Sequence, residues 1–215
     1  MNIHHIYCIS GFGADERVFG KIDFGDHDVH FIQWKIPEKH ESIQNYAARM
    51  AKEVKHANPI LIGLSFGGMM AIEIAKLIPV EKVILVSSVC CRKELPFYMK
   101  ITSALNLNRL IPMKPYRILE PLENYNLGVE NDEQKKLLKQ YRNSLNLQYS
   151  NWAIDQVVNW KNEWLPSSYI HIHGTKDHIF PIKYIIRPDY VIEGTGHLLL
   201  MNKADEVNKI LEKEL

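Results

Sequence analysis

Short runs of hydrophobic and β-branched residues alternate along this chain with longer stretches of mixed polarity. Unbroken apolar runs are typical of strands buried on both faces of a parallel sheet. On this basis we expect six strands, at residues 3–9, 29–34, 59–63, 82–86, 169–173 and 189–193.

The stretches between these strands carry the spacing of amphipathic helices. After Ser42, apolar side chains recur every three or four residues, at Ile43, Tyr46, Ala47, Met50 and Val54. This spacing places them on one face of a helix. Further helices are predicted at 15–21, with Asp15 as its N-cap, at 66–78 and at 204–212.

Strand–helix alternation predicts an α/β domain with a mostly parallel sheet of about six strands flanked by helices. Residues 89–165 interrupt the alternation, because they contain no convincing strand and include a charged helical stretch around 130–145. We interpret them as a helical insertion in a single domain, 1–215, whose core is formed by 1–88 and 166–215.

Composition narrows the function classes. Lys and Arg number 26 against 25 for Asp and Glu, so the 215-residue chain lacks the basic excess of a nucleic-acid-binding protein. No stretch reaches the roughly 18 apolar residues of a membrane span, and the N-terminus does not read as a signal peptide. Three cysteines, Cys8, Cys90 and Cys91, fit a reducing compartment, and we expect a cytoplasmic protein.

The strongest chemical signal is the sequence Gly63-Leu64-Ser65-Phe66-Gly67, a G-x-S-x-G motif between a buried strand and a helix. A serine on such a sharp turn has its hydroxyl held clear of the sheet, and the glycines let neighbouring backbone approach. The helix N-terminus places partial positive charge where an oxyanion would form. Ser65 is therefore the candidate nucleophile.

A serine hydroxyl needs a base to remove its proton and an acid to orient that base. His197 follows the last predicted strand and is the best candidate base. Asp177 follows the preceding strand and is the best candidate acid, although a loop Asp is more often a turn former or a helix cap. The order Ser, Asp, His is that of an α/β-hydrolase triad.

With these motifs the chain resembles the α/β-hydrolase superfamily, which includes esterases, thioesterases and related lyases. The resemblance covers about 3–87 and 169–211. Ser10-Gly11-Phe12-Gly13 is similar to the family's H-G-x-G turn, which implies that Phe12 and Phe66 supply backbone N–H groups to an oxyanion hole. Ser10 stands where the family often has histidine, and the family's leading antiparallel hairpin is not evident.

The resemblance also implies that the insertion at 89–165 is a lid over a buried site with apolar walls. Tyr98, Trp152 and Trp160 are candidate substrate-binding residues. Large aromatic residues are equally expected in the core of a lid, and for at least half of the lid's aromatic residues we favour that role.

Other chemistry is less well supported. His171 and His173 alternate on a strand and could bind a metal together, but no third ligand is evident, so no metal site is predicted. The Ser10–Gly13 turn lacks the lysine of a P-loop and the full dinucleotide-binding pattern. No cofactor is expected.

The sequence therefore predicts a serine hydrolase that cleaves a small-molecule carboxylic ester or thioester through an acyl-enzyme intermediate. Two alternatives stay open. The same triad could serve C–C bond hydrolysis, acyl transfer or a lyase step, or the protein could sense a ligand or bind a partner and retain a slow triad. The substrate itself and the oligomeric state are not indicated by the sequence.

Overall fold

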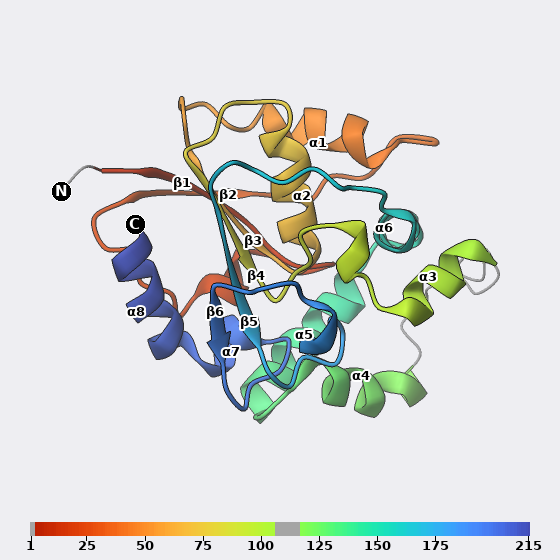
Figure 1. Ribbon diagram of the computed structural model, residues 1–215. Coiled ribbons are helices and arrows are strands. Elements are labelled where there is room, and N and C mark those ends of the chain that lie inside the picture. Colours follow the sequence, from red (N-terminus) through yellow and green to blue (C-terminus); the bar gives the residue numbers. More distant parts are fainter. Residues whose placement is uncertain (1–2, 106–116) are drawn as a thin grey trace.

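The computed structural model describes residues 3–105 and 117–215, and it is built around one parallel sheet (Figure 1). The strands lie in the order β2-β1-β3-β4-β5-β6, and every neighbouring pair is parallel. This confirms the expected sheet of about six strands. Their bounds are β1 (His5–Ile9), β2 (Asp28–Ile32), β3 (Ile60–Leu64), β4 (Lys82–Val86), β5 (Tyr169–Gly174) and β6 (Tyr190–Ile192).

Helices cover both faces of the sheet. One face packs against α1 (Ile43–Ala51) and α2 (Phe66–Ala75). The other packs against the 3-10 helix η1 (Glu16–Phe19), the short α7 (Leu199–Asn202) and α8 (Ala204–Glu214). Since each face is covered, the central strand β3 is buried along its whole length, as its unbroken apolar run predicts.

The helix starts follow the capping chemistry of the sequence. The Ser42 side chain accepts a hydrogen bond from the Asn45 amide, and Asp15 accepts one from the Arg17 amide. Helix α2 ends at Ala75 rather than at residue 78, because the chain tightens there and the Leu77 amide bonds to the Ile74 carbonyl at 2.8 Å.

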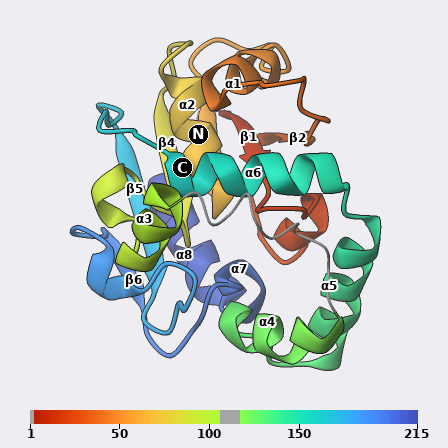
Figure 2. The same cartoon turned by 90° about the vertical axis from the view of Figure 1, so that its right-hand side faces the viewer.

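The segment between β4 and β5 is helical where the structure describes it. It contains the short 3-10 helices η2 (Arg92–Glu94) and η4 (Arg117–Leu119) and four α-helices. Figure 2 shows the α-helices arranged around the edge of the sheet at which the strands end. They are α3 (Phe97–Ala104), α4 (Glu120–Leu127), α5 (Asp132–Ser144) and α6 (Leu147–Asn159). We call 89–165 the cap segment.

Among the described residues, none of the helices combines the length and the apolar character that crossing a bilayer requires.

Candidate active site

The turn from β3 to α2 holds Ser65 in a strained conformation, with φ 54° and ψ −119°. A non-glycine residue adopts this region only when its surroundings impose it. The Ser65 amide donates to the Val86 carbonyl at 2.9 Å, and the Ser88 hydroxyl donates to the Ser65 carbonyl at 2.7 Å. A Cβ on Gly67 would lie 2.2 Å from the Ile9 carbonyl oxygen, so this position requires glycine.

Ser65, His197 and Asp177 form a continuous hydrogen-bonded series. His197 Nε2 lies 2.8 Å from Ser65 Oγ, and His197 Nδ1 lies 2.7 Å from Asp177 Oδ2. A carboxylate only accepts, so Nδ1 carries the proton and Nε2 is left to accept the serine hydroxyl proton. All three residues are buried, at 8%, 6% and 2% exposure respectively.

Hydrogen bonds to both carboxylate oxygens hold the Asp177 side chain in place. Its Oδ1 accepts from the amides of Ile179 and Phe180, each at 2.8 Å. Burial alone would raise the pKa of this carboxyl, but the charge and hydrogen bond of His197, together with His173 and the Phe180 amide, outweigh it and lower the pKa. Asp177 therefore remains ionised near neutral pH.

The loop after β1 lies beside the serine. Ser10, at the position where histidine is frequent in the family, donates its hydroxyl to the Ala14 carbonyl at 2.7 Å. The Trp34 indole in turn donates to Ser10 Oγ and to the Gly11 carbonyl, each at 3.0 Å. Serine and tryptophan thus shape this loop. Phe12, on that loop, and Phe66, the first residue of α2, line the same cavity as Ser65.

A cavity of about 500 Å³ opens beside Ser65 and His197. The sheet edge and the cap segment both line it, and the cap side is largely apolar. The polar exceptions from the cap segment are Glu123, Asn126, Tyr141 and Arg142, and the Arg142 guanidinium is ion-paired with Glu120 at 2.8 Å. The apolar lining residues from the cap segment are Met99, Leu127, Leu138, Leu145, Ile154, Val157 and Val158.

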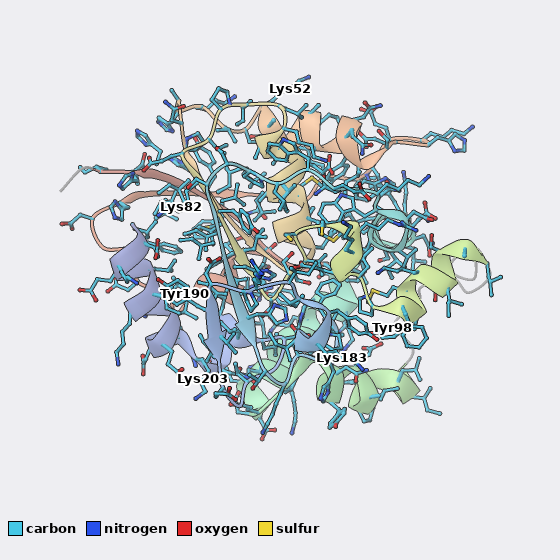
Figure 3. All side chains as sticks on the ribbon, in the orientation of Figure 1. Lys52, Lys82, Tyr98, Lys183, Tyr190 and Lys203 are labelled. Atoms are coloured by element: carbon cyan, nitrogen blue, oxygen red, sulfur yellow. The ribbon has the colours of Figure 1, made fainter. Side chains whose placement is uncertain are left out.

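The three aromatic residues predicted to bind substrate are not among the residues that line this cavity. Tyr98 is 41% exposed on α3 and its hydroxyl donates to the Ile179 carbonyl (Figure 3). Trp152 packs on Tyr46, with ring centroids 4.2 Å apart. Trp160 is 2% exposed and donates to the buried Glu73 carboxylate at 2.8 Å. The two tryptophans pack the cap segment against α1 and α2. This is the core role that was the alternative to substrate binding in the sequence.

Sequence reasoning missed a second layer of histidines behind Asp177. His173 Nε2 donates to the Phe180 carbonyl at 2.8 Å, and His171 Nε2 donates to the Ser88 carbonyl at 3.1 Å. His173 Nδ1 lies 3.3 Å from His171 Nε2. Through Ser88, whose hydroxyl donates to the Ser65 carbonyl, the two rings connect the Ser65 turn to the Asp177 loop. Their alternation on the strand was visible in the sequence, but these partners were not.

The loop that carries His197 is attached to the cap segment. The Leu198 amide donates to the Leu127 carbonyl at the end of α4, at 3.0 Å. A Cβ on Gly128 would lie only 3.1 Å from the Gly196 Cα, so these backbones are in close contact. The Asn202 side chain donates to the Gly128 carbonyl at 2.8 Å.

Residues 4–210 match the model of the alpha/beta hydrolase family. The chain belongs to the alpha/beta hydrolase family. A search of the curated proteins finds no match for this alpha/beta hydrolase.

Solved structures of low sequence identity share the fold of this alpha/beta hydrolase. A thermophilic esterase from Thermogutta terrifontis is 16% identical, with a TM-score of 0.76 over 98% of this chain and 88% of that one. Est816, described as an N-acyl homoserine lactone degrading enzyme, is 15% identical, with a TM-score of 0.73 over 100% and 94%. MenH from S. aureus is 14% identical, with a TM-score of 0.73 over 99% and 94%.

Proposed function

We propose that this alpha/beta hydrolase is a serine hydrolase that cleaves a carboxylic ester or thioester by way of an acyl-enzyme. The observation that carries the proposal is the series Ser65–His197–Asp177, with contacts of 2.8 and 2.7 Å, at the mouth of an apolar cavity. A nucleophile, a base and an orienting acid within hydrogen-bond reach are the requirements for acyl transfer.

In the proposed reaction, His197 Nε2 takes the Ser65 proton as Oγ attacks the substrate carbonyl. Asp177 keeps the imidazole in the required tautomer and stabilises its protonated form. The leaving alcohol or thiol receives the proton from His197. Water, deprotonated by the same imidazole, then attacks the acyl-enzyme carbonyl. The carboxylic acid is released as the Ser65 Oγ–acyl bond breaks and His197 returns the proton to Oγ.

The amides of Phe12 and Phe66 are the proposed donors to the oxyanion of each tetrahedral intermediate. Phe66 begins α2, so the partial positive charge of the helix N-terminus acts at the same point. Removing one such donor typically costs about 2.7–4 kcal/mol of transition-state stabilisation.

We further propose that the cap segment is the lid of this single domain and that its apolar wall selects the acyl group. The names of the similar structures include esterases, a lactone-degrading enzyme and MenH, so the fold alone leaves the reaction open. The apolar cap wall and the ion-paired state of Arg142 favour an uncharged acyl chain over an anionic one.

Hydrolysis of p-nitrophenyl esters from acetate to octanoate, and of matching thioesters, tests the proposal together with fluorophosphonate labelling. Replacing Ser65 with Ala is expected to abolish labelling and to lower kcat/KM by about 10⁴-fold or more. Ser144→Ala is the matched control, because this serine is exposed on α5, and it should label and turn over like the wild type. Full labelling of Ser65→Ala, or equal turnover by it, would overturn the assignment.

A further inference from the structure

Three histidines and an aspartate gather at the end of the sheet opposite the candidate active site. They are His5, Asp28, His30 and His56, and one potential ligand atom from each lies within 4.8 Å of all the others. It is the one such group found in the described parts of the chain. The mechanism proposed above uses none of these residues.

Strand register creates the group. His5 pairs with Asp28, and Tyr7 pairs with His30, across the parallel strands β1 and β2. Because alternate residues of a strand point to the same face, His5, Asp28 and His30 share one face of this strand pair. His56 comes from the loop between α1 and β3, and its Nδ1 is hydrogen-bonded to the Tyr7 hydroxyl at 2.8 Å.

Asp28 lies at the centre. One of its oxygens, Oδ2, is 2.9 Å from His5 Nδ1 and 2.9 Å from His30 Nε2. The His5 and His56 rings are stacked with centroids 3.7 Å apart. Three imidazoles and one carboxylate therefore converge in a partly exposed position.

We propose that His5, Asp28, His30 and His56 form a structural binding site for Zn²⁺. Imidazole nitrogen and carboxylate oxygen are zinc ligands, and four of them complete a tetrahedral shell. With bonds of about 2.0–2.1 Å, ligand atoms in such a shell are roughly 3.3 Å apart. The present separations, from 2.9 Å up to 4.8 Å, bracket that value, so side-chain rotation and a tilt of one stacked ring complete the shell.

Binding requires a change of tautomer. The nitrogens of His5 and His30 that face the Asp28 carboxylate carry protons in the metal-free site, because a carboxylate only accepts. When Zn²⁺ binds these nitrogens, each neutral imidazole carries its proton on the other ring nitrogen, and no oxidation or reduction is involved.

The Tyr7 hydroxyl supports the ring of His56 from outside the shell, and it also accepts from the Lys55 amide at 2.9 Å. A surface hollow of about 450 Å³ is lined in part by Tyr7, His30 and His56, and it gives an ion a route from solvent.

The location argues for a structural rather than a catalytic metal. His5 and Asp28 begin their strands, whereas the loop with Phe12 follows the end of β1. Ile9 lies four positions after His5 on the strand, a distance of about 13 Å at 3.3 Å per residue. A metal here would join the starts of β1 and β2, the edge strand, to the loop that precedes β3.

Zinc titration of the full chain, after removal of metal with EDTA and exchange out of the chelator, tests this site against a chromophoric competitor. We expect one Zn²⁺ per chain and an affinity at least tenfold weaker in His5→Gln and in His30→Gln. The control His40→Asn removes an exposed histidine from a positive-φ turn that asparagine tolerates, and its affinity should stay within twofold of the wild type.

His56→Gln keeps the test valid if the strand variants fold poorly, because His56 lies on a loop; it too should bind at least tenfold more weakly. Saturating Zn²⁺ should raise the Tm of the wild type and of His40→Asn by more than it raises the Tm of His30→Gln. Ester hydrolysis by the wild type should not change with Zn²⁺. Less than one equivalent bound by the wild type, or equal affinity in His30→Gln and His56→Gln, would overturn the site.

Discussion

The side chains of His171 and His173 are buried one behind the other on β5, at 1% and 0% exposure. Burial lowers the pKa of His171 to about 3, and it also lowers the pKa of His173 despite the nearby Asp177 carboxylate. Both rings are therefore neutral near pH 7, and each uses its Nε2 proton to hold a carbonyl. The hydrogen bonds that His171 and His173 make behind Asp177 therefore involve the neutral form of histidine.

Stability should accordingly fall in acid. The folded-state pKa of His171 lies below the unfolded value of about 6.5, so between about pH 6.5 and pH 3 the unfolded chain binds more protons than the folded one. The free energy of unfolding should therefore fall as pH falls through this window. In His171→Gln, whose amide can still donate, the slope should be shallower by up to about 1.4 kcal/mol per pH unit.

Urea unfolding at pH 4, 5, 6 and 7 measures these slopes. His40→Asn is the control, because it removes an exposed histidine and leaves the buried pair in place. If the slope in His171→Gln equals that of the wild type, the buried His171 ring does not contribute to the loss of stability at low pH.

Motif and chain order in the sequence were sufficient to select Ser65, Asp177 and His197, since each follows a strand that ends at one edge of the sheet. The zinc-ligand group could not be selected in this way. His5, Asp28 and His56 lie on three separate segments, and only the register of β1 with β2 brings the first two together. Register depends on the packing of whole strands and has no signature in residue spacing.

At the scale of the element, α2 packs against the sheet with backbone in contact with backbone. A Cβ on Gly67 would meet the carbonyl oxygens of Ile9 and Ser10 at 2.2 and 2.4 Å. A Cβ on Gly63 would meet the Gly67 carbonyl oxygen at 2.4 Å. The close approach sets the position of the Ser65 turn relative to the loop of Phe12.

Gly67→Ala should therefore destabilise the fold and impair ester hydrolysis, even though alanine favours helix by about 1 kcal/mol over glycine. The clashing atoms belong to the backbone and cannot rotate away, so α2 must move. We expect a net loss of about 1–3 kcal/mol in the free energy of unfolding by urea, and at least a tenfold loss in kcat/KM.

The matched control is Gly20→Ala, at φ −61°, where the nearest atom to the new Cβ would be 3.2 Å away. Its stability should change by no more than about 1 kcal/mol. Wild-type stability and activity in Gly67→Ala would mean that the approach of α2 to the sheet is less constrained than described.

Elements were predictable to within a few residues, and the errors lie at their ends. The first strand begins at His5 rather than at residue 3, and β2 ends at Ile32 rather than at 34. The identity of each element follows from the hydrophobic run, whereas its ends depend on where the neighbouring strand offers a hydrogen-bond partner.

At the scale of the whole molecule, the cavity is lined on one side by the cap segment and on the other by residues at the carboxyl ends of the strands. Helix α6 contributes Ile154, Val157 and Val158, which are spaced by three and four residues and so lie on one face. Trp152 and Trp160 instead contact α1 and α2. The sequence predicts the helical cap, but the direction of each helix face follows only from packing. The spacing at 154, 157 and 158 was the available signal for the lining.

Under the proposed function, a larger side chain on this face should shorten the accepted acyl chain. Ile154→Trp is expected to lower kcat/KM for the octanoyl ester at least tenfold and to leave the acetyl ester within threefold of the wild type, because only the long chain needs the filled volume. Rates on the p-nitrophenyl ester series measure this preference.

Ile118→Trp provides the comparison, since Ile118 is 86% exposed and is not among the lining residues. It should leave the chain-length profile unchanged. An equal loss on acetyl and octanoyl esters in Ile154→Trp would place the acyl chain elsewhere.

The bond from the Leu198 amide to the Leu127 carbonyl has a consequence for timing. Under the proposed function, a displacement of α4 that preserved this bond would also move the loop that carries His197, the proposed base, away from Ser65. The position of α4 beside the cavity and the readiness of Ser65 to react would then be coupled through a single backbone hydrogen bond.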